Sequence, residues 1–283
     1  MRTRLVAGSL VVLGLTLASL EVRAQQAQRQ PPPSLDQLKA MPTPRDADGK
    51  PVLMGWWGGG GGGGFGGALG APNERGDVFV AMPARDGRLQ NLENDSYISQ
   101  KSEDNVPQYK PEYWSKVRDL DLHGNLQDPA FNCKPQGVPR QGPPNRIVQL
   151  GAEVILFNGT TIRDFRVGQK RNPDDLLIET WNGVPEGRWD GDTLIVESIG
   201  FNDQSWLGWG GFFHSFDMKV TETFTRVGNA LHYTALVEDP VLIEPWHARD
   251  QWMIFSPNQN ATIPEATPCE ERDKNHIVNN RRG

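Results

Sequence analysis

The stretch that decides the fold runs from Pro185 to Asp239 and reads PEGRWDGDTLIVESIGFNDQSWLGWGGFFHSFDMKVTETFTRVGNALHYTALVED. Runs rich in Val, Ile, Thr, Tyr and Phe alternate with short turn sequences, which is typical of antiparallel hairpins. Strands are expected at 193–199, 218–225 and 231–237. Asp190-Gly191 suits a type I′ turn because both residues tolerate positive φ, and Gly228-Asn229 marks a second turn. The stretch therefore predicts an antiparallel meander.

The middle strand carries two titratable groups on the face that is expected to be buried. If the strand begins as early as His214, one face is apolar except for two members and consists of His214, Phe216, Met218, Val220, Glu222 and Phe224. A charge on such a face is costly unless it is paired or hydrogen-bonded. His214 and Glu222 are therefore predicted either as satisfied structural groups or as parts of a pocket. A strand that starts later would leave His214 in a loop.

Further strand candidates lie outward from this stretch, at 146–150, 153–157, 161–167 and 246–255. Tight turns at Gly151-Ala152 and Asn158-Gly159 separate the first three, and almost no helix is expected between residues 146 and 255. This spacing predicts a mainly β domain over residues 131–283, an antiparallel up-and-down β-barrel or sandwich. Residues 46–130 are predicted to be an irregular N-terminal region with a Gly-rich insertion at 58–67 and a short helix near 109–120.

The first residues have the pattern of a bacterial export signal. Residues 1–24 combine a basic start, an apolar run at 5–20 and small residues before Gln25, so a signal peptide and a periplasmic or secreted protein are expected. Residues 25–45 are rich in Gln and Pro and are predicted to be a disordered tether, in which 34–39 has the composition of a helical turn.

Charge and cysteine content limit the partners. The formal net charge is −6, which argues against nucleic acid and against an anionic membrane as partners after signal cleavage. An exported chain with two cysteines, Cys133 and Cys269, suggests one disulfide. The five histidines show no spacing typical of metal ligands, so neither a metal nor another cofactor is expected.

Aromatic and titratable residues gather around the middle strand and suggest a binding cup for a small aromatic, hydrophobic or sugar-like molecule. The residues expected to contact the ligand are Trp206, Trp209, Phe216, Arg140 and Tyr233. The alternative is a cofactor-free lyase, isomerase or hydrolase in which His214 acts with Asp203 or Glu222 as acid and base. A structural or interaction module is the third possibility, and it is favoured if side chains fill the barrel. The oligomeric state has no sequence signal.

Several motifs resemble those of a large family of secreted soil-bacterial proteins, most of which have no known activity. The motifs are Asp48-Gly-Lys-Pro51, Gly55-Trp-Trp57, Cys133-Lys-Pro-Gln-Gly-Val-Pro-Arg140, Arg146-Ile-Val-Gln149, Gly187-Arg-Trp-Asp-Gly-Asp-Thr-Leu-Ile-Val-Glu197, Gly200-Phe-Asn-Asp203, Trp206-Leu207, His214-Ser215, Val220-Thr-Glu-Thr-Phe224, Glu238-Asp-Pro240 and Glu244-Pro-Trp246. They cover roughly residues 46–57 and 131–276, and the glycine run departs from the family pattern. The resemblance implies a signal peptide followed by a calycin-like (lipocalin-like) barrel, and it implies no activity.

Overall fold

The computed structural model describes residues 33–58, 107–122, 128–208, 211–263 and 265, and from Leu38 onward these belong to one compact unit. The expected signal peptide, residues 59–67 of the Gly-rich insertion, Trp209 and Cys269 lie outside the described residues, so the predictions on them stay predictions. The first described element is helix α2 (Leu35–Lys39), where the expected helical turn is confirmed. Ser34 and Gln37 cap its start by exchanging two side chain–backbone hydrogen bonds of 2.8 and 3.3 Å.

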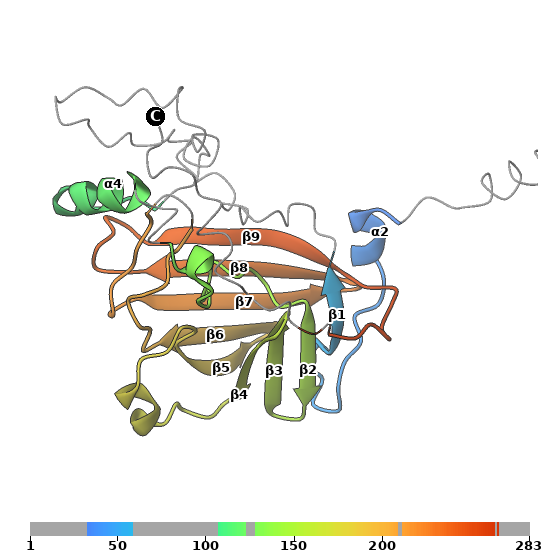
Figure 1. Ribbon diagram of the computed structural model, residues 1–283. Coiled ribbons are helices and arrows are strands. Elements are labelled where there is room, and N and C mark those ends of the chain that lie inside the picture. Colours follow the sequence, from blue (N-terminus) through green and yellow to red (C-terminus); the bar gives the residue numbers. More distant parts are fainter. Residues whose placement is uncertain (1–32, 59–106, 123–127, 209–210, 264, 266–283) are drawn as a thin grey trace, which may run out of the picture. The chain divides into compact units, whose positions relative to one another are not determined.

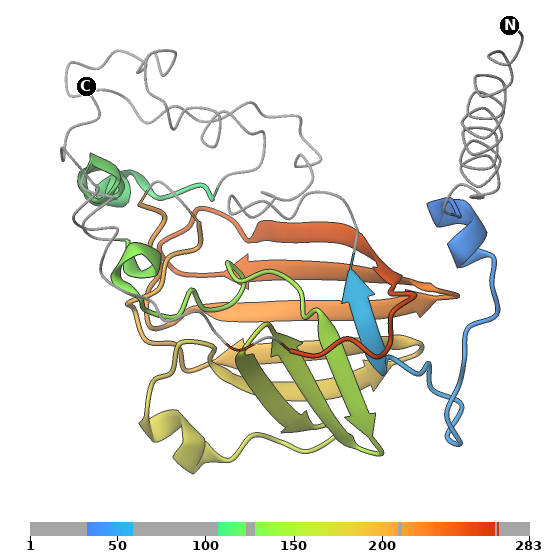
Figure 2. The ribbon, with the colours of Figure 1, turned by 45° about the vertical axis from the view of Figure 1, so that its right-hand side comes forward.

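Nine antiparallel strands form one sheet that curls into a nearly closed barrel (Figures 1 and 2), and the predicted mainly β, barrel-like fold is confirmed. The order across the sheet is β4-β3-β2-β1-β9-β8-β7-β6-β5. The strands are β1 (Gly55–Gly58), β2 (Arg146–Leu150), β3 (Glu153–Asn158), β4 (Thr161–Arg166), β5 (Val184–Asp190), β6 (Thr193–Ile199), β7 (Lys219–Val227), β8 (Ala230–Glu238) and β9 (Trp246–Phe255). In both views β2–β4 run at a steep angle to the long strands β7–β9.

Two-residue turns connect β2 to β3, β3 to β4, β5 to β6, and β7 to β8. Each turn has a glycine as its first central residue, with φ between 55° and 60°: Gly151, Gly159, Gly191 and Gly228. The second central residue has no positive φ in any of them. The type I′ turn expected at Asp190-Gly191 is therefore wrong, because the centre is Gly191-Asp192 and only the glycine takes positive φ, as in a type II′ turn.

The barrel begins earlier in the chain than residue 131. Strand β1 lies between β2 and β9, with Trp56 opposite Arg146 and Trp57 opposite Phe255. The preceding residues are also attached to the barrel rather than forming a loose tether as far as residue 45. The amide of Gly228 donates to the Thr43 hydroxyl at 2.8 Å, and Arg45 pairs with Asp192 at 2.6 Å. The irregular region predicted from residue 46 thus contains one strand of the sheet.

The edges of the sheet, β4 and β5, meet at a seam. Their ladder is not continuous, but the amide of Gly168 donates to the carbonyl oxygen of Gly187 at 2.8 Å. The ring of Phe165 lies against the backbone of Gly187, where any Cβ would stand 2.3 Å from a ring carbon. A glycine in a strand often marks a close approach of this kind, and here it brings the two edges together.

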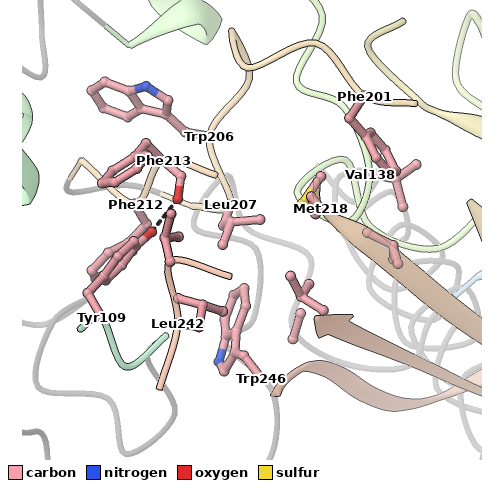
Figure 3. Close-up of a cluster of buried hydrophobic side chains, with 14 of the residues drawn as sticks. Tyr109, Val138, Phe201, Trp206, Leu207, Phe212, Phe213, Met218, Leu242 and Trp246 are labelled. Atoms are coloured by element: carbon pink, nitrogen blue, oxygen red, sulfur yellow. Dashed lines mark hydrogen bonds between the residues drawn. The ribbon is translucent and has the colours of Figure 1, made fainter. Parts of the chain in front are cut away.

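Buried side chains form two clusters. The first lies inside the barrel and includes Trp57, Leu156, Phe165, Leu194 and Phe224. The second, which we call the end cluster, lies where β7 begins and β8 ends and contains Tyr109, Val138, Phe201, Trp206, Leu207, Phe212, Phe213, Met218, Val220, Val237, Val241, Leu242, Trp246 and Ala248 (Figure 3). The Tyr109 hydroxyl donates to the carbonyl oxygen of Phe213 within it.

Short helices flank the end cluster and the loops. The turn η2 (Pro111–Tyr113) leads into helix α4 (Trp114–Leu122). Val117 of α4 also belongs to the end cluster, and Tyr113 of η2 packs against it together with Trp114 and Leu120 of α4. The helix expected near 109–120 is thereby confirmed. The single turns η3 (Pro129–Asn132) and η4 (Pro173–Leu177) complete the helical elements of the described residues, and the Val138–Pro139 peptide is cis.

Candidate functional site

A buried ion pair crosses the barrel interior. Glu222 on β7 accepts two hydrogen bonds from the Arg163 guanidinium on β4, at 2.5 and 2.9 Å. The Tyr233 hydroxyl on β8 donates to the same carboxylate at 2.8 Å. All three side chains are buried. The sequence placed Glu222 and Tyr233 at a site but missed Arg163, although strand alternation puts Arg163 on the same inward face as Phe165.

Burial and the charge of Glu222 shift the pKa values of Arg163 and Tyr233. Burial opposes the charged form of Arg163, but the charge and hydrogen bonds of Glu222 outweigh it and raise the Arg163 pKa above its ordinary value. Burial, reinforced by the neighbouring Glu222 charge, raises the pKa of Tyr233 well above its usual range. The network is therefore charge-neutral, as expected of a structural ion pair, and both Glu222 oxygens have partners within it, whereas the buried Nε of Arg163 has none.

A second buried arginine holds the loop after η3. Arg140 forms a bidentate pair with Asp128, both contacts being 2.7 Å, and both side chains are buried. Arg249 on β9 donates to the Arg140 carbonyl oxygen at 3.0 Å. The Arg140 guanidinium, which the sequence predicts as a ligand contact, is thus paired with Asp128 in the structure.

His214 lies in a loop and not on the middle strand. Strand β7 begins at Lys219, because a turn at Phe216-Asp217 interrupts the alternation before Met218. Of the two possible starts of this strand, the structure shows the later one, which leaves His214 in a loop, and the inward face begins only at Met218. Phe216, which was expected to contact a ligand from that face, is instead half exposed at 51%. Glu222 does lie on the inward face, as alternation predicted.

Both ring nitrogens of His214 have partners within the loop. Nδ1 lies 3.0 Å from the carbonyl oxygen of Ser215, which can only accept, so Nδ1 carries the proton. Nε2 then accepts from the Ser205 hydroxyl at 2.7 Å. The Ser215 amide and hydroxyl in turn donate to the Asp239 carboxylate, at 2.8 and 2.9 Å. Ser205 and His214 are almost completely buried, at 1% and 2% exposure.

Burial lowers the pKa of His214, although the Ser215 carbonyl and the charges of Asp239 and Asp203 oppose the shift. Between its lowered folded pKa and its unfolded pKa of about 6.5, the unfolded chain binds more protons than the folded chain. Stability is therefore expected to fall as the pH drops below about 6.5, by at most about 1.4 kcal/mol per pH unit from this one group.

The measurement is urea unfolding between about pH 7.5 and pH 5.5, a window above the ordinary carboxylate pKa values. In the His214→Gln variant an amide can accept from Ser205 and donate to Ser215 without titrating, so the slope should flatten. An unchanged slope in this variant would show that another group causes the pH dependence.

The remaining predicted residues do not form one constellation. Trp206 belongs to the buried end cluster together with Phe212 and Phe213, so these rings do not line an open cup. Asp203 is exposed; it acts on His214 only through its charge, and no hydrogen bond joins them. His214 and Glu222 belong to two different hydrogen-bond networks.

The described surface has a recess where β6 and β8 end and β7 begins, which we call the acidic recess. Its volume is about 530 Å³, and four carboxylates line it, from Asp217, Glu238, Asp239 and Glu244. Lys219 is its one lysine or arginine and pairs with Glu238 at 2.6 Å. The apolar part of the wall consists of Ile199, Leu242, Ile243, Pro240 and Pro245.

Within the part of the chain that the structure describes, no three side chains of His, Cys, Asp or Glu are grouped so that they could hold a metal ion. In the same residues, no helix has the length and apolar character needed to span a bilayer. Comparison of the chain with protein-family models, with curated proteins and with solved structures finds no match.

Proposed function

We propose that the protein is an exported binding protein for small organic cations that carry an apolar body, and that the acidic recess is the binding site. The observation that carries the proposal is the pairing of four carboxylates with an apolar wall in one recess of about 530 Å³. That volume lies within the ~300–1,000 Å³ typical of small-molecule sites. The expected export rests on the signal pattern of residues 1–24 and on the family resemblance.

Charge complementarity selects a cation. Lys219 neutralises one of the four carboxylates, and among the described residues Asp217 makes no salt bridge. Asp239 accepts three hydrogen bonds, from the amide and hydroxyl of Ser215 and from the amide of Val241, which fix its carboxylate in place. An ammonium group placed among these charges gains Coulomb energy that an alcohol or an anion of the same size does not gain.

The apolar wall of the acidic recess favours a ligand whose remaining part is apolar. Ile243 is 59% exposed and Leu242 lies behind it in the end cluster, so an apolar body laid on this wall removes hydrocarbon surface from water. The wall is fixed, because backbone hydrogen bonds join Ile243 to Gln108 at 2.8 Å and Lys110 to Val241 at 3.0 Å. A preformed wall lowers the entropy cost of binding.

The same geometry disfavours the acid–base alternative. His214 is 2% exposed and Glu222 is 0% exposed, and both ring nitrogens of His214 and both carboxylate oxygens of Glu222 already have hydrogen-bond partners. A general acid or base must come within hydrogen-bonding distance of a substrate. The acidic recess, by contrast, is open to solvent.

The test is calorimetric titration of the full chain with 2-phenylethylamine, 2-phenylethanol and phenylacetate, which differ mainly in charge. We expect the amine to bind most tightly, and we expect Asp217→Asn to weaken it about two- to fivefold, the effect of one partly exposed charge. Raising the salt concentration from about 0.05 M to about 0.5 M should lower the affinity for the amine but not the affinity for the alcohol.

Asp164→Asn is the matched control, because Asp164 is an exposed carboxylate on β4 outside the acidic recess. It removes the same charge from the chain and should leave the amine affinity unchanged. Equal affinity for the amine and the alcohol, or equal weakening by both variants, would refute a cation site here.

A further inference from the structure

The turn η4 and the residue after it carry the two most exposed large apolar side chains of the described residues. Leu177 is 80% exposed and Ile178 is 74% exposed. The turn is the olive-coloured coil at the lower left of Figures 1 and 2, at the outer margin of the barrel beyond β5 and β6. Leu176 packs the other way, since a Cβ on Gly200 would stand 2.9 Å from its side chain. One leucine thus holds the turn to the barrel, and the next two aliphatic side chains face solvent.

Hydrogen bonds fix this segment at both ends. At its start, the Asn172 side chain accepts from the amide of Asp174 at 3.1 Å. After the turn, the amide of Thr180 donates to the carbonyl oxygen of Gly200 at 3.0 Å. The backbone therefore holds the apolar pair outward. Singly scattered apolar side chains are ordinary on a protein surface, whereas adjacent ones on a fixed support are a feature of interaction sites.

The charges around the apolar pair are mostly negative. Three exposed carboxylates of the same segment make no salt bridge with another described residue: Asp174, Asp175 and Glu179. The two cations that precede the turn are already paired, Lys170 with Glu186 at 2.7 Å and Arg171 with Glu197 at 3.2 Å. The segment therefore presents an excess of negative charge beside its apolar side chains.

These features together indicate the kind of partner. Side chains three residues apart lie on one side of a 3-10 helix, so Asp174 and Leu177 face the same partner. Lys and Arg side chains complement such a surface, because their charged ends meet the carboxylates and their stems cover apolar surface. A second copy of this acidic chain, or an anionic membrane, would instead bring like charge to the same place.

We propose that the segment 174–179 is a docking surface for a basic amphipathic segment of another protein, in which Lys or Arg alternates with aliphatic residues. We call it the η4 surface. A polypeptide can cover both outward side chains and reach the carboxylates, whereas a small molecule on an outward-facing pair would leave most of its own surface in water. None of the residues of the η4 surface lines the acidic recess, so this site is independent of the cation site.

The test is fluorescence anisotropy of the full chain with a fluorescein-labelled amphipathic peptide of Leu and Lys. A Ser/Lys peptide and a Leu/Glu peptide of the same length and pattern are the comparison probes. We expect the Leu/Lys peptide to bind most tightly. The double variant Leu177→Ser, Ile178→Ser should lower its affinity about tenfold or more, because two side chains lose apolar burial in the complex. Asp174→Asn combined with Asp175→Asn should lower it about two- to fivefold.

Folding should survive these changes, because the altered side chains are exposed, and Tm should stay within about 2 °C of wild type. Ile162→Ser is the matched control, since Ile162 is a 56% exposed aliphatic side chain on β4 outside the η4 surface, and it should leave the affinity unchanged. Asp217→Asn in the acidic recess should change peptide affinity less than about twofold while it weakens amine binding.

Equal affinity for the Leu/Lys and Ser/Lys peptides would overturn the proposal, as would equal weakening by Ile162→Ser. A loss of peptide affinity in Asp217→Asn as large as in the Leu177→Ser, Ile178→Ser variant would place the peptide in the acidic recess instead. Sedimentation supplies the last arm. Self-association of wild type, or its binding to phosphatidylcholine vesicles, that only this double variant abolishes would show that a second copy or a membrane covers the surface, and would also overturn the proposal.

Discussion

Replacement of Glu222 by Gln is expected to lower the free energy of unfolding by about 3–5 kcal/mol, because it leaves the Arg163 guanidinium buried without its counter-charge. Both side chains are almost fully buried, at 2% and 0% exposure for Arg163 and Glu222. Solvent therefore cannot screen the remaining charge. Urea unfolding at neutral pH measures the loss.

The same ion pair should be replaceable as a unit. A triple variant, Arg163→Met, Glu222→Met and Tyr233→Phe, removes both charges and the hydroxyl that donates to the carboxylate. Its stability should return to within about 1–2 kcal/mol of wild type, since buried ion pairs often equal apolar replacements. Asp164→Asn, an exposed change on β4, should stay within about 0.5 kcal/mol. A loss below about 1 kcal/mol for Glu222→Gln would mean that water reaches the pair.

Gly187→Ala is expected to destabilise the barrel by about 1–3 kcal/mol or more through overpacking at the seam. A Cβ at this position would lie 2.3 and 2.6 Å from two ring carbons of Phe165, which is itself buried. The ring cannot move without exposing apolar surface. Hydrogen exchange at the Gly168 amide, which bonds to the Gly187 carbonyl, should accelerate with the loss of stability.

A smaller side chain at position 165 should restore part of the stability that this variant loses. Adding Phe165→Leu to Gly187→Ala should cost less than the sum of the two single changes, because the two groups occupy the same space. Gly58→Ala is the matched control, since Gly58 also lies in a strand but has open space where a Cβ would stand. If the two losses of stability were strictly additive, the groups at the seam would be shown to move apart enough to accommodate the added methyl group.

Local pattern was enough to predict most of the sheet. The run from Thr193 to Ile199 alternates between inward and outward residues over its whole length, and its predicted bounds coincide with those of β6. The glycine turns bound the hairpins in the same way. These features depend on neighbours in the chain, which is the information that a single sequence carries most clearly.

Contacts between distant segments could not be read in this way. Arg163 and Glu222 are 59 residues apart, and only the curling of the sheet brings their strands face to face. The loop position of His214 depends on a two-residue turn that alternation does not reveal. The acidic recess includes residues from loops and turns, where no period relates one side chain to the next.

The short strand β1 also determines when the barrel can form during synthesis. It is the first strand of the sheet in chain order, yet two of its four residues pair with Ile254 and Phe255 at the end of β9. Sheets that depend on such distant partners form slowly, because the chain loses the entropy of closing a long loop before any stabilising contact forms. The barrel therefore cannot close until the chain has been made as far as Phe255.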